Sequence, residues 1–346
     1  MKYQTQKKFS LYVILIALSA TFGPIYGLIF TSDWSLASLL PMTLDGVIGG
    51  ILLWGGMIFL WPSRICAPLR RLSFPWHVVL LLALVALCIP LTGSISGSIQ
   101  YGQFTPFLGF GPGWSLYLYI LVITTLTVII IQIAQVIGPR ILANMLIGRY
   151  HDPVEEHRIF LFIDLIGSTA LAQQLGDLGF QRLLTRIFFD IGRPVAEHGG
   201  EIHAYVGDEV IVTWQFTSGA SEARCVRCFF AVRDLLRDNA ETYERLFGTR
   251  PGIRAGLHGG PVIVSECGDT KKSIVYFGDT MNTSARLEGE AKRLEKDLVI
   301  SQELLQSIEV PGEFKAEKLG SVILRGHDSP TSLVALSRKE SGSVDH

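Results

Sequence analysis

FLFIDLIGSTA, the stretch from Phe160 to Ala170, joins an apolar run to a glycine and two hydroxyl residues. A short apolar run that ends at turn residues is typical of a buried strand, and Ser or Thr at that point is typical of a helix start. The stretch therefore predicts a strand, a turn and a helix, with Asp164 at the junction. A carboxylate there either caps the helix or binds a ligand such as a cation, and these residues alone leave both interpretations open.

From Arg158 onward, short strand-like runs alternate with longer helical ones. Strands are predicted at about residues 159–164, 201–206, 209–214, 252–258, 261–266 and 273–277. Helices are predicted at about 179–197, 221–247 and 281–294. This order is that of an α+β ferredoxin-like (βαββαβ) domain with extra strands at its end, over residues 158–337. We expect residues 338–346 to form a disordered tail.

The first part of the chain has the composition of a membrane protein. Four apolar segments, at about residues 10–30, 39–61, 76–91 and 114–137, have lengths near the roughly 20 residues that cross a bilayer as a helix. The third is the weakest candidate, because Pro90 lies near its end. We therefore predict a multi-span α-helical membrane domain over residues 1–138, with the lipid bilayer as its partner.

The distribution of Lys and Arg predicts the orientation of this domain. Basic residues flank the chain start, the connection between the second and third segments, and the exit after the fourth, whereas the other two connections carry none. By the positive-inside rule, the N-terminus and the second half of the chain are cytoplasmic, and the protein is a multi-pass protein of the cell (inner) membrane. A cleaved signal peptide at residues 1–20 is the rival interpretation, although its apolar core would be unusually long.

Two features of this part have two interpretations each. Asp45, near the outer end of the second segment, is either a functional intramembrane carboxylate or a side chain that reaches interfacial water. Residues 139–157 form a juxtamembrane linker, in which a short amphipathic helix ends before Asp152–Pro153. That linker is either a plain spacer or an element that couples the membrane domain to the rest of the chain.

Charge and cysteine content exclude some classes of function. Residues 1–150 carry eight basic and two acidic residues, whereas the remainder carries 22 basic and 29 acidic ones. The acidic second half argues against nucleic acid as a partner. Cys225 and Cys228 form a C-x-x-C pair inside a predicted helix, and without a second ligand pair they are interpreted as half-buried helix residues.

Asp208, in a tight turn between two predicted strands, is a possible companion of Asp164. If antiparallel neighbours bring the two carboxylates together, the pair can hold divalent cations beside a phosphate. The helix that begins at Gly167–Thr169 would present N–H groups to that anion. A haloacid-dehalogenase-like phosphatase would also begin with a strand-end Asp, but it needs a second Asp at the position of Ile166.

A second group of residues lies in FGDTMNTSARLE, residues 277–288. Asn282 and Arg286 are four residues apart, which places them on one face of a predicted helix. An Asn can orient a sugar oxygen, and an Arg can neutralise charge on a phosphorus transition state. By itself the pair is also compatible with an ordinary surface pair at a helix start.

Four motifs, taken in order, make this chain similar to the class III nucleotidyl cyclase catalytic domain of the bacterial membrane-anchored type. They are F-x-D-x-x-G-S-T at 162–169, Y-V-G-D-E-V at 205–210, G-x-R-A-G-L-H-G-G at 252–260 and G-D-x-x-N-T-x-A-R at 278–286. The resemblance implies an adenylate cyclase that converts ATP to 3′,5′-cyclic AMP and pyrophosphate, with two Mg²⁺ or Mn²⁺ per site. It also implies a homodimer in which each site combines residues of both subunits.

The resemblance also implies roles for individual residues. Asp164 and Asp208 would bind the metals together with the backbone carbonyl of Leu165, Asn282 would orient the ribose, and Arg286 would stabilise the transition state. The implied phosphate-binding residues are Ile166, Gly167, Ser168, Thr169 and Arg325.

Two positions depart from the family pattern. Members that select adenine by side chain usually carry a Lys and an Asp or Thr where this chain has Ala204 and Val275, neither of which can hydrogen-bond a purine edge. Base selection then rests on backbone groups, on neighbours such as Tyr205 or Lys272, or is loose. The alternatives are therefore a guanylate or promiscuous cyclase and, from a different class, a membrane receptor whose cyclase-like domain binds nucleotide without turnover.

Overall fold

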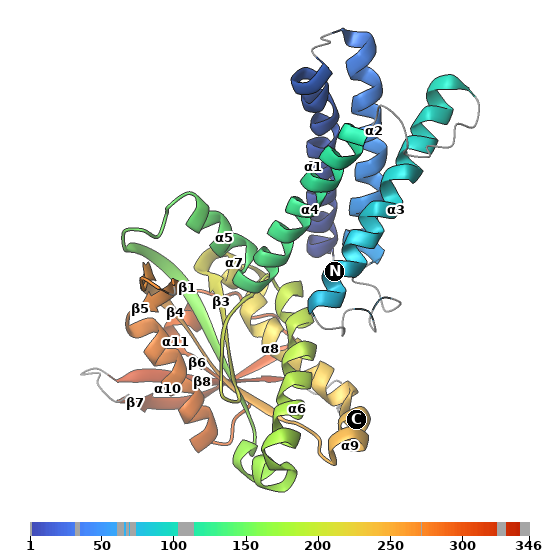
Figure 1. Cartoon of the computed structure of the whole chain (residues 1–346). Helices are drawn as coiled ribbons and strands as arrows, with labels where there is room; N and C mark the ends of the chain where they lie inside the picture. Colours follow the sequence, from blue (N-terminus) through green and yellow to red (C-terminus); the bar gives the residue numbers. More distant parts are fainter. Residues whose placement is uncertain are drawn as a thin grey trace, which may run out of the picture. The chain divides into compact units, whose positions relative to one another are not determined.

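The computed structural model describes residues 2–31, 35–60, 66, 69, 74–102, 114–270, 272–323 and 330–339. The chain forms two compact units, Met1–Pro139 and Arg140–His346. In Figure 1 the first unit is helical, and the second is a twisted sheet with helices packed against it.

The described part of the first unit contains the helices α1 (Lys2–Tyr26), α2 (Leu36–Gly55), α3 (Phe74–Tyr101) and α4 (Trp114–Ile137). Three of the described stretches are long and apolar enough to cross a membrane, namely Phe9–Ile29, Leu39–Leu60 and Leu82–Ile99. In α4 the described apolar stretch is the shorter Leu118–Thr127. The apolar helices of a multi-pass membrane protein are thus present, and the fourth span stays a prediction.

Helix α3 is longer than the sequence indicates. The third apolar segment predicts an end near Leu91, but the helix continues through Pro90 to Tyr101. Proline is tolerated within an apolar helix when neighbouring helices and Ser or Thr side chains satisfy the backbone groups around it. Close to Pro90, the Thr92 Oγ1 adds a bond to the helix backbone by donating to the carbonyl of Cys88 at 2.8 Å.

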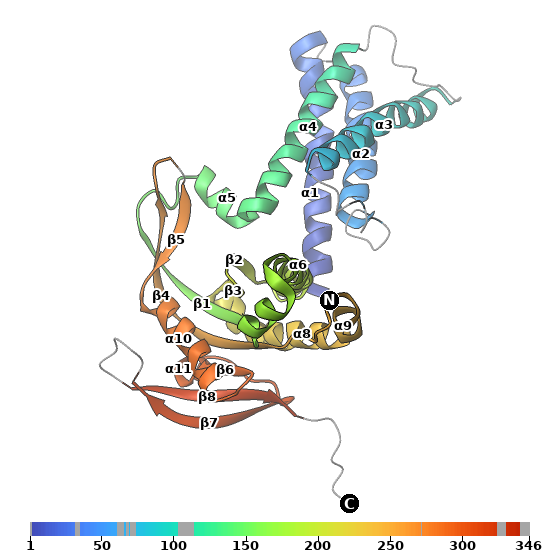
Figure 2. The same cartoon turned by 60° about the horizontal axis from the view of Figure 1, so that its bottom comes forward.

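The second unit is built on one sheet of β1 (Val154–Leu165), β2 (Glu201–Val206), β3 (Glu209–Gln215), β4 (Ile253–Cys267), β5 (Ser273–Phe277), β6 (Leu298–Ser301), β7 (Phe314–Val322) and β8 (Thr331–Arg338). The order across the sheet is β2-β3-β1-β4-β6-β8-β7, and β5 pairs with β4 (Figure 2). The first four strands have the order of the βαββαβ fold, so the predicted fold class is confirmed. This order makes β1 a central strand, paired antiparallel with β3 on one side and with β4 on the other.

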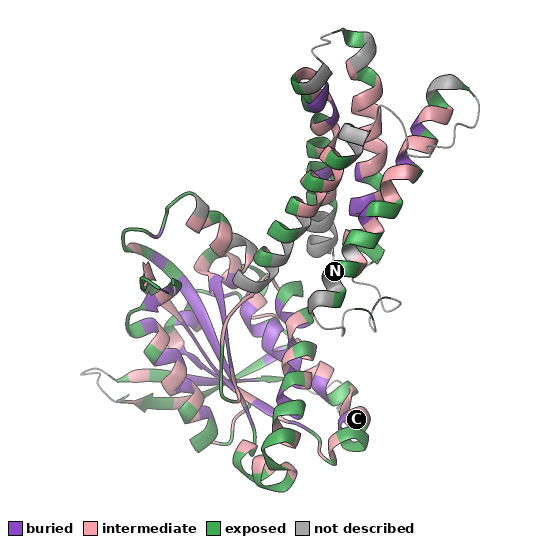
Figure 3. Ribbon diagram, viewed as in Figure 1, coloured by how far each residue is buried: buried purple, intermediate pink, exposed green. Residues whose placement is uncertain are grey.

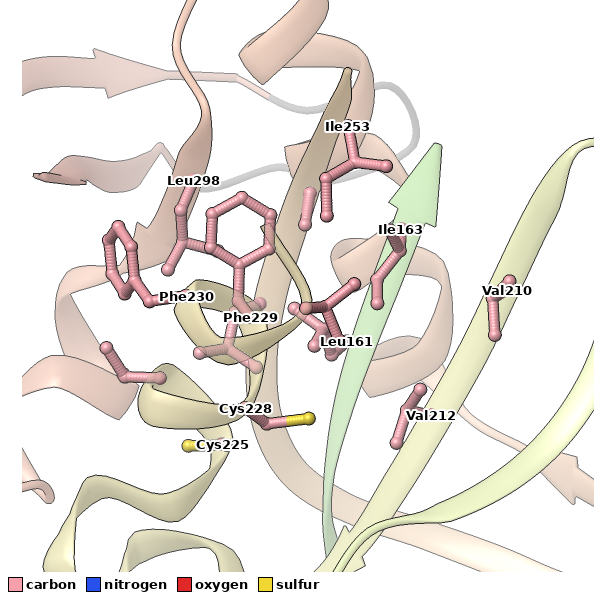
Figure 4. Close-up of a cluster of buried hydrophobic side chains, with 14 of the residues drawn as sticks. Leu161, Ile163, Val210, Val212, Cys225, Cys228, Phe229, Phe230, Ile253 and Leu298 are labelled. Carbon is pink, nitrogen blue, oxygen red and sulfur yellow. The ribbon is translucent and has the colours of Figure 1, made fainter. Parts of the chain in front are cut away.

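One face of the sheet is covered by the helices α6 (Ser168–Glu197) and α8 (Arg224–Asp238). Leu161 and Ile163 of β1 point to this face, because alternate strand residues share a face, and they join the larger core cluster (Figure 4). Cys225 and Cys228 lie in the same core and are fully buried, more deeply than the sequence predicts. Burial raises the pKa of the Cys225 thiol to about 12, so it packs as an apolar side chain.

The other face carries Phe160 and Phe162, against which helix α10 (Asp279–Arg293) packs. Ile141 and Met145 of the short helix α5 (Pro139–Leu146) pack against the same cluster. Figure 3 shows that buried residues run along the central strands between these two layers. β1 is therefore covered on both faces, which accounts for its continuous apolar run.

Polar contacts attach the segment after α5 to the sheet. The Asn144 amide donates to the Tyr150 hydroxyl at 2.8 Å, and that hydroxyl donates to Glu156 at 3.1 Å. The Arg158 guanidinium, 1% exposed, donates to the same carboxylate at 2.9 Å. The predicted linker 139–157 is thus too long, because residues 154–157 already belong to β1 and pair with β4.

Two other predicted boundaries differ from the structure. The two strands expected at 252–258 and 261–266 form the single strand β4, which continues through Pro261. Pro261 pairs with His157 of β1, but on its other side β4 pairs with β6 only at residues 255–257 and with β5 only at 263–267, so a proline is tolerated there. The long helix expected at 221–247 is divided at Asn239 into α8 and α9 (Ala240–Phe247).

Candidate active site

Asp164 lies one residue before the end of β1, on the face that α10 covers. The strand alternation that buries Phe160 and Phe162 on this face also directs Asp164 toward α10. Its register partner on β4 is Arg254, whose Nε lies 3.5 Å from Asp164 Oδ2. Glu288 of α10 lies close to Asp164 from the helix side, and its negative charge contributes to the raised pKa of Asp164.

Asp208 occupies the tight turn between β2 and β3, as the sequence predicts. Gly207 adopts φ 62°, a left-handed conformation that glycine tolerates best, and Val206 pairs directly with Glu209 across the turn. Asp208 lies close enough to Asp164 that its negative charge contributes to the raised pKa of Asp164. The structure therefore brings together the two aspartates singled out from the sequence.

These groups form an acidic cluster of Asp164, Asp208, Glu209 and Glu288 around Arg254. Burial is the main cause that raises the pKa of Asp164 to about 7, followed by the negative charges of Glu288 and Asp208, while Arg254 opposes the shift. Burial and the same neighbouring carboxylates raise the pKa of Glu209 to about 7. So much negative charge beside one Arg favours binding of a cation. Carboxylate oxygens are the ligands that Mg²⁺ and Mn²⁺ prefer.

The cluster predicts how stability depends on pH. Between 3.8 and about 7, Asp164 holds a proton in the folded chain that it loses in the unfolded chain, so the free energy of unfolding falls as pH rises through this window. A bound cation offsets the repulsion that develops. We expect Mn²⁺ to increase hydrogen-exchange protection of the β1 amides clearly at about pH 8 and only weakly at about pH 5. Asp177→Asn, at an exposed position outside the cluster, should leave this difference unchanged, and equal protection at both pH values would contradict it.

The predicted phosphate-binding turn follows β1 directly. Gly167, at φ 72°, is the residue before α6, and it makes no side-chain cap. The alternative that Asp164 caps this helix is therefore wrong. The first N–H groups of α6, at Ser168 and Thr169, have no acceptor within the helix and can bind an anion. The N–H of Ile166 already donates to the Gly252 carbonyl at 2.9 Å, so it is unsuited to that role.

Asn282 and Arg286 lie on α10 but on a different side from Glu288. At about 100° per residue, Asn282 and Arg286 are about 40° apart, whereas Glu288 is about 160° from Arg286. Because Glu288 lies close to Asp164, the Asn–Arg pair of the same chain points away from the acidic cluster. Asn282 is exposed, and Nη1 of Arg286 is buried with no hydrogen-bond partner among the described residues. A buried guanidinium nitrogen without a hydrogen-bond partner favours binding of an anionic group that is not part of this chain's own fold.

The position of α10 depends on Gly256 of β4. A Cβ at this residue would lie 2.2 Å from the Glu288 backbone nitrogen and 2.4 Å from the Ser284 carbonyl oxygen. We expect Gly256→Ala to destabilise the second unit by about 1–3 kcal/mol or more, because helix and strand must separate. Labelling of the buried Cys228 thiol during urea unfolding would measure the change. Gly289→Ala on α10, where a Cβ meets nothing within 4 Å, is the matched control and should not destabilise the protein.

Sequence reasoning missed Arg254, Glu209 and Glu288. Arg254 lies in the third motif, and an antiparallel pairing of that motif with β1 would have placed it opposite Asp164. Glu209 directly follows Asp208, and Glu288 lies two residues after the fourth motif. The positions of Glu209 and Glu288 next to motif residues were the available signal. The direction in which these side chains point depends on strand register and on helix packing.

The candidate base-selecting residues lie on β2 and β5. Ala204 is half-buried beside the second core cluster, and Val275 pairs with Ser265 of β4. Tyr205 stacks on Phe188 with ring centroids 4.6 Å apart, and Lys272 Nζ lies 2.6 Å from Glu266 Oε1. Both suggested base readers thus have other contacts.

Arg325, the remaining candidate phosphate ligand, lies outside the described residues.

Comparison with known proteins agrees with this geometry. A family model for the "Adenylate and Guanylate cyclase catalytic domain" matches residues 151–336. The chain is 36% identical over 226 residues to adenylate cyclase 2 of Rhizobium meliloti (strain 1021), which covers 65% of this chain and 62% of that protein. It is 24% identical over 204 residues to an adenylate cyclase of Anabaena cylindrica, covering 58% of this chain and 40% of that protein. The chain thus spans less than two thirds of the length of these relatives.

A bacterial light-regulated adenylyl cyclase structure is also similar, with a TM-score of 0.55 and 19% identity over 68% of this chain and 67% of that one. This likeness concerns the fold. The fold and the paired aspartates define an α+β domain suited to nucleotide phosphate chemistry. The chain belongs to the adenylate and guanylate cyclase catalytic domain family, and apolar helices precede its cyclase domain.

Proposed function

We propose that this protein is a membrane-bound adenylate cyclase that converts ATP to 3′,5′-cyclic AMP and pyrophosphate. The observation that carries the proposal is the closeness of Asp164 and Asp208 beside the turn at Gly167, in a chain of the cyclase family. The 36% identity to an adenylate cyclase supports ATP as the substrate. Ala204 and Val275 leave a guanylate or promiscuous cyclase as the second candidate.

Two divalent cations, Mg²⁺ or Mn²⁺, fit the acidic cluster. Asp164, Asp208 and the backbone carbonyl of Leu165 are the proposed ligands, since carboxylate and carbonyl oxygens suit these ions. No set of three or more candidate ligand side chains in metal-binding geometry occurs among the described residues, so water and nucleotide phosphates would complete the coordination. When bound, the cations would lower the pKa of the ribose 3′-hydroxyl and neutralise charge on the phosphates.

The residues of the chain itself would then position the nucleotide. The N–H groups of Gly167, Ser168 and Thr169 hold the triphosphate, and Arg325 contributes a further positive charge to it. Asn282 orients the ribose so that its 3′-oxygen faces the α-phosphorus. Arg286 stabilises the charge that develops as the new P–O bond forms and the bond to pyrophosphate breaks.

A homodimer is the arrangement that allows all these groups to act together. Within one chain, Glu288 faces the acidic cluster and Asn282 and Arg286 face away from it. In a two-fold dimer the same surface meets its own copy, so the Asn–Arg pair of one subunit can face the aspartates of the other. The unsatisfied Nη1 of Arg286 supports this arrangement.

We also propose the membrane arrangement of the whole chain. Residues 1–138 span the inner membrane four times, and the cyclase domain, whose first strand begins at Val154, is cytoplasmic together with the N-terminus. The apolar helices α1 to α4 and the flanking basic residues support this topology.

One assay tests the reaction and the base together. The full chain in detergent or nanodiscs is incubated with Mn²⁺ and either ATP or GTP, and the cyclic products are separated and quantified. Formation of cyclic AMP well above cyclic GMP supports the proposal, and comparable amounts of both favour the promiscuous alternative. If neither cyclic AMP nor cyclic GMP forms at protein concentrations that permit dimers, the enzyme proposal is wrong. The remaining candidate would then be a receptor that binds nucleotide without turnover.

A further inference from the structure

The helices of the membrane unit form a partly open cavity of about 120 Å³. All four helices line it, and the bundle that contains it is seen from another side in Figure 2. Most of its lining is apolar, with Leu53, Val85 and Ile120 among the side chains, and Asp45 is the one charged group among the described lining residues. The volume is comparable to the roughly 150 Å³ of an apolar protein cavity that binds benzene.

Glycines of α2 explain why the bundle is tight in one place and open in another. A Cβ at Gly46 would lie 2.3 Å from the Ser19 carbonyl oxygen, so this glycine is needed for contact between α1 and α2. A Cβ at Gly49 would meet Thr92 of α3 only at 3.5 Å, an ordinary contact distance. Close helix packing therefore does not require Gly49. Its missing side chain leaves space on the α3 side of α2.

Asp45 gives this space a specific chemistry. The Ser96 hydroxyl donates a hydrogen bond to its carboxylate, but no Lys, Arg or His occurs among the described residues that line the cavity. An ionised carboxylate at membrane depth is costly unless a positive group neutralises it. A ligand with one protonated amine and an apolar body would supply that charge and fill the rest of the space.

We propose that the cavity between α1, α2, α3 and α4 is a binding site for a small lipophilic amine, with the ammonium group on Asp45. The apolar part lies against Leu53, Val85 and Ile120, and Gly49 provides the room for it. This site belongs to the membrane unit and is separate from the nucleotide site proposed above. It gives the bundle a role in recognition as well as in anchoring.

Fluorine NMR of the full chain in lipid nanodiscs tests this proposal. The probes are para-fluorobenzylamine and its neutral counterpart para-fluorotoluene, and nanodiscs without protein report partition into lipid. We expect saturable binding of the amine by the native protein. Asp45→Asn should weaken amine binding about tenfold or more and leave the neutral probe unaffected, because it removes the charge at nearly constant size.

Gly49→Leu should weaken binding of both probes, because its side chain fills the cavity. Leu87→Phe, at a position of α3 that is 66% exposed, is the matched control and should bind like the native protein. Circular dichroism spectra of all three variants in nanodiscs should match the native spectrum, which would show that the helices of the preparations are folded. Amine signals identical to those of empty nanodiscs, or unchanged amine binding by Asp45→Asn or Gly49→Leu, would overturn the proposal.

Discussion

Arg286→Ala is expected to slow formation of the cyclic nucleotide about 100- to 1,000-fold. The guanidinium is proposed to neutralise charge that appears only as the α-phosphorus is attacked, and removal of one such group in other enzymes costs about 3–4 kcal/mol. The loss should appear mainly in kcat and less in KM, because the charge is greatest in the transition state. Steady-state kinetics with ATP and Mn²⁺ would measure both.

Arg293 of the same helix offers a matched control. It lies one to two turns further along α10, its side chain is 58% exposed, and it pairs with Glu290 at 2.6 Å. Arg293→Ala removes the same charge without touching the proposed site, so its kcat should stay within about twofold of the native value. A similar loss in both variants would show that general charge on α10, and not a specific contact of Arg286, supports the reaction.

A mixture of two inactive chains is expected to regain activity. In an Asp164→Ala/Arg286→Ala heterodimer, one composite site combines two defects and the other combines native residues only. Random pairing of equal amounts makes half of the dimers mixed, so about one quarter of the native site activity should return. The measurement is cyclic nucleotide formation after the two proteins are co-expressed or mixed under conditions that allow subunit exchange.

The control for this experiment is a mixture whose defects belong to the same half-site. Asp164→Ala mixed with Asp208→Ala should remain inactive in every pairing, because each composite site would lack one of the two aspartates on the same side. Failure of the first mixture, with exchange of subunits verified, would contradict a shared site. Activity in the control mixture would indicate that the two aspartates of one site come from different subunits.

The fold was largely predictable because its signals are local. The apolar run before Asp164, the Gly207–Asp208 turn and the helix containing Asn282 each follow from a short stretch of sequence. The differences arise where an element depends on partners distant in the chain. β4 remains one strand through Pro261 because of where β5 and β6 pair, and β1 starts at Val154 because β4 pairs with it there.

The candidate site divides in the same way. Motif spacing predicted Asp164 and Asp208, and the structure brings them close enough for the charge of Asp208 to raise the pKa of Asp164. Motif spacing could not predict that Arg254 and Glu288 lie close to Asp164, because the first depends on strand register and the second on how α10 rotates over the sheet. The choice between adenine and guanine is also outside the motifs, since Ala204 and Val275 carry no polar group.

The contacts between Tyr150, Glu156 and Arg158 decide where this chain can be cut for protein engineering. A soluble fragment that starts at Arg158 would lose Glu156, the closer of two carboxylates that pair with the buried Arg158 guanidinium, and would leave it to Glu201 at 3.6 Å. It would also remove Ile141 and Met145 of α5, which pack against the core cluster that contains Phe160 and Phe162. Fragments and sensor fusions should therefore join the chain before Arg140, so that α5 is carried along as part of the catalytic module.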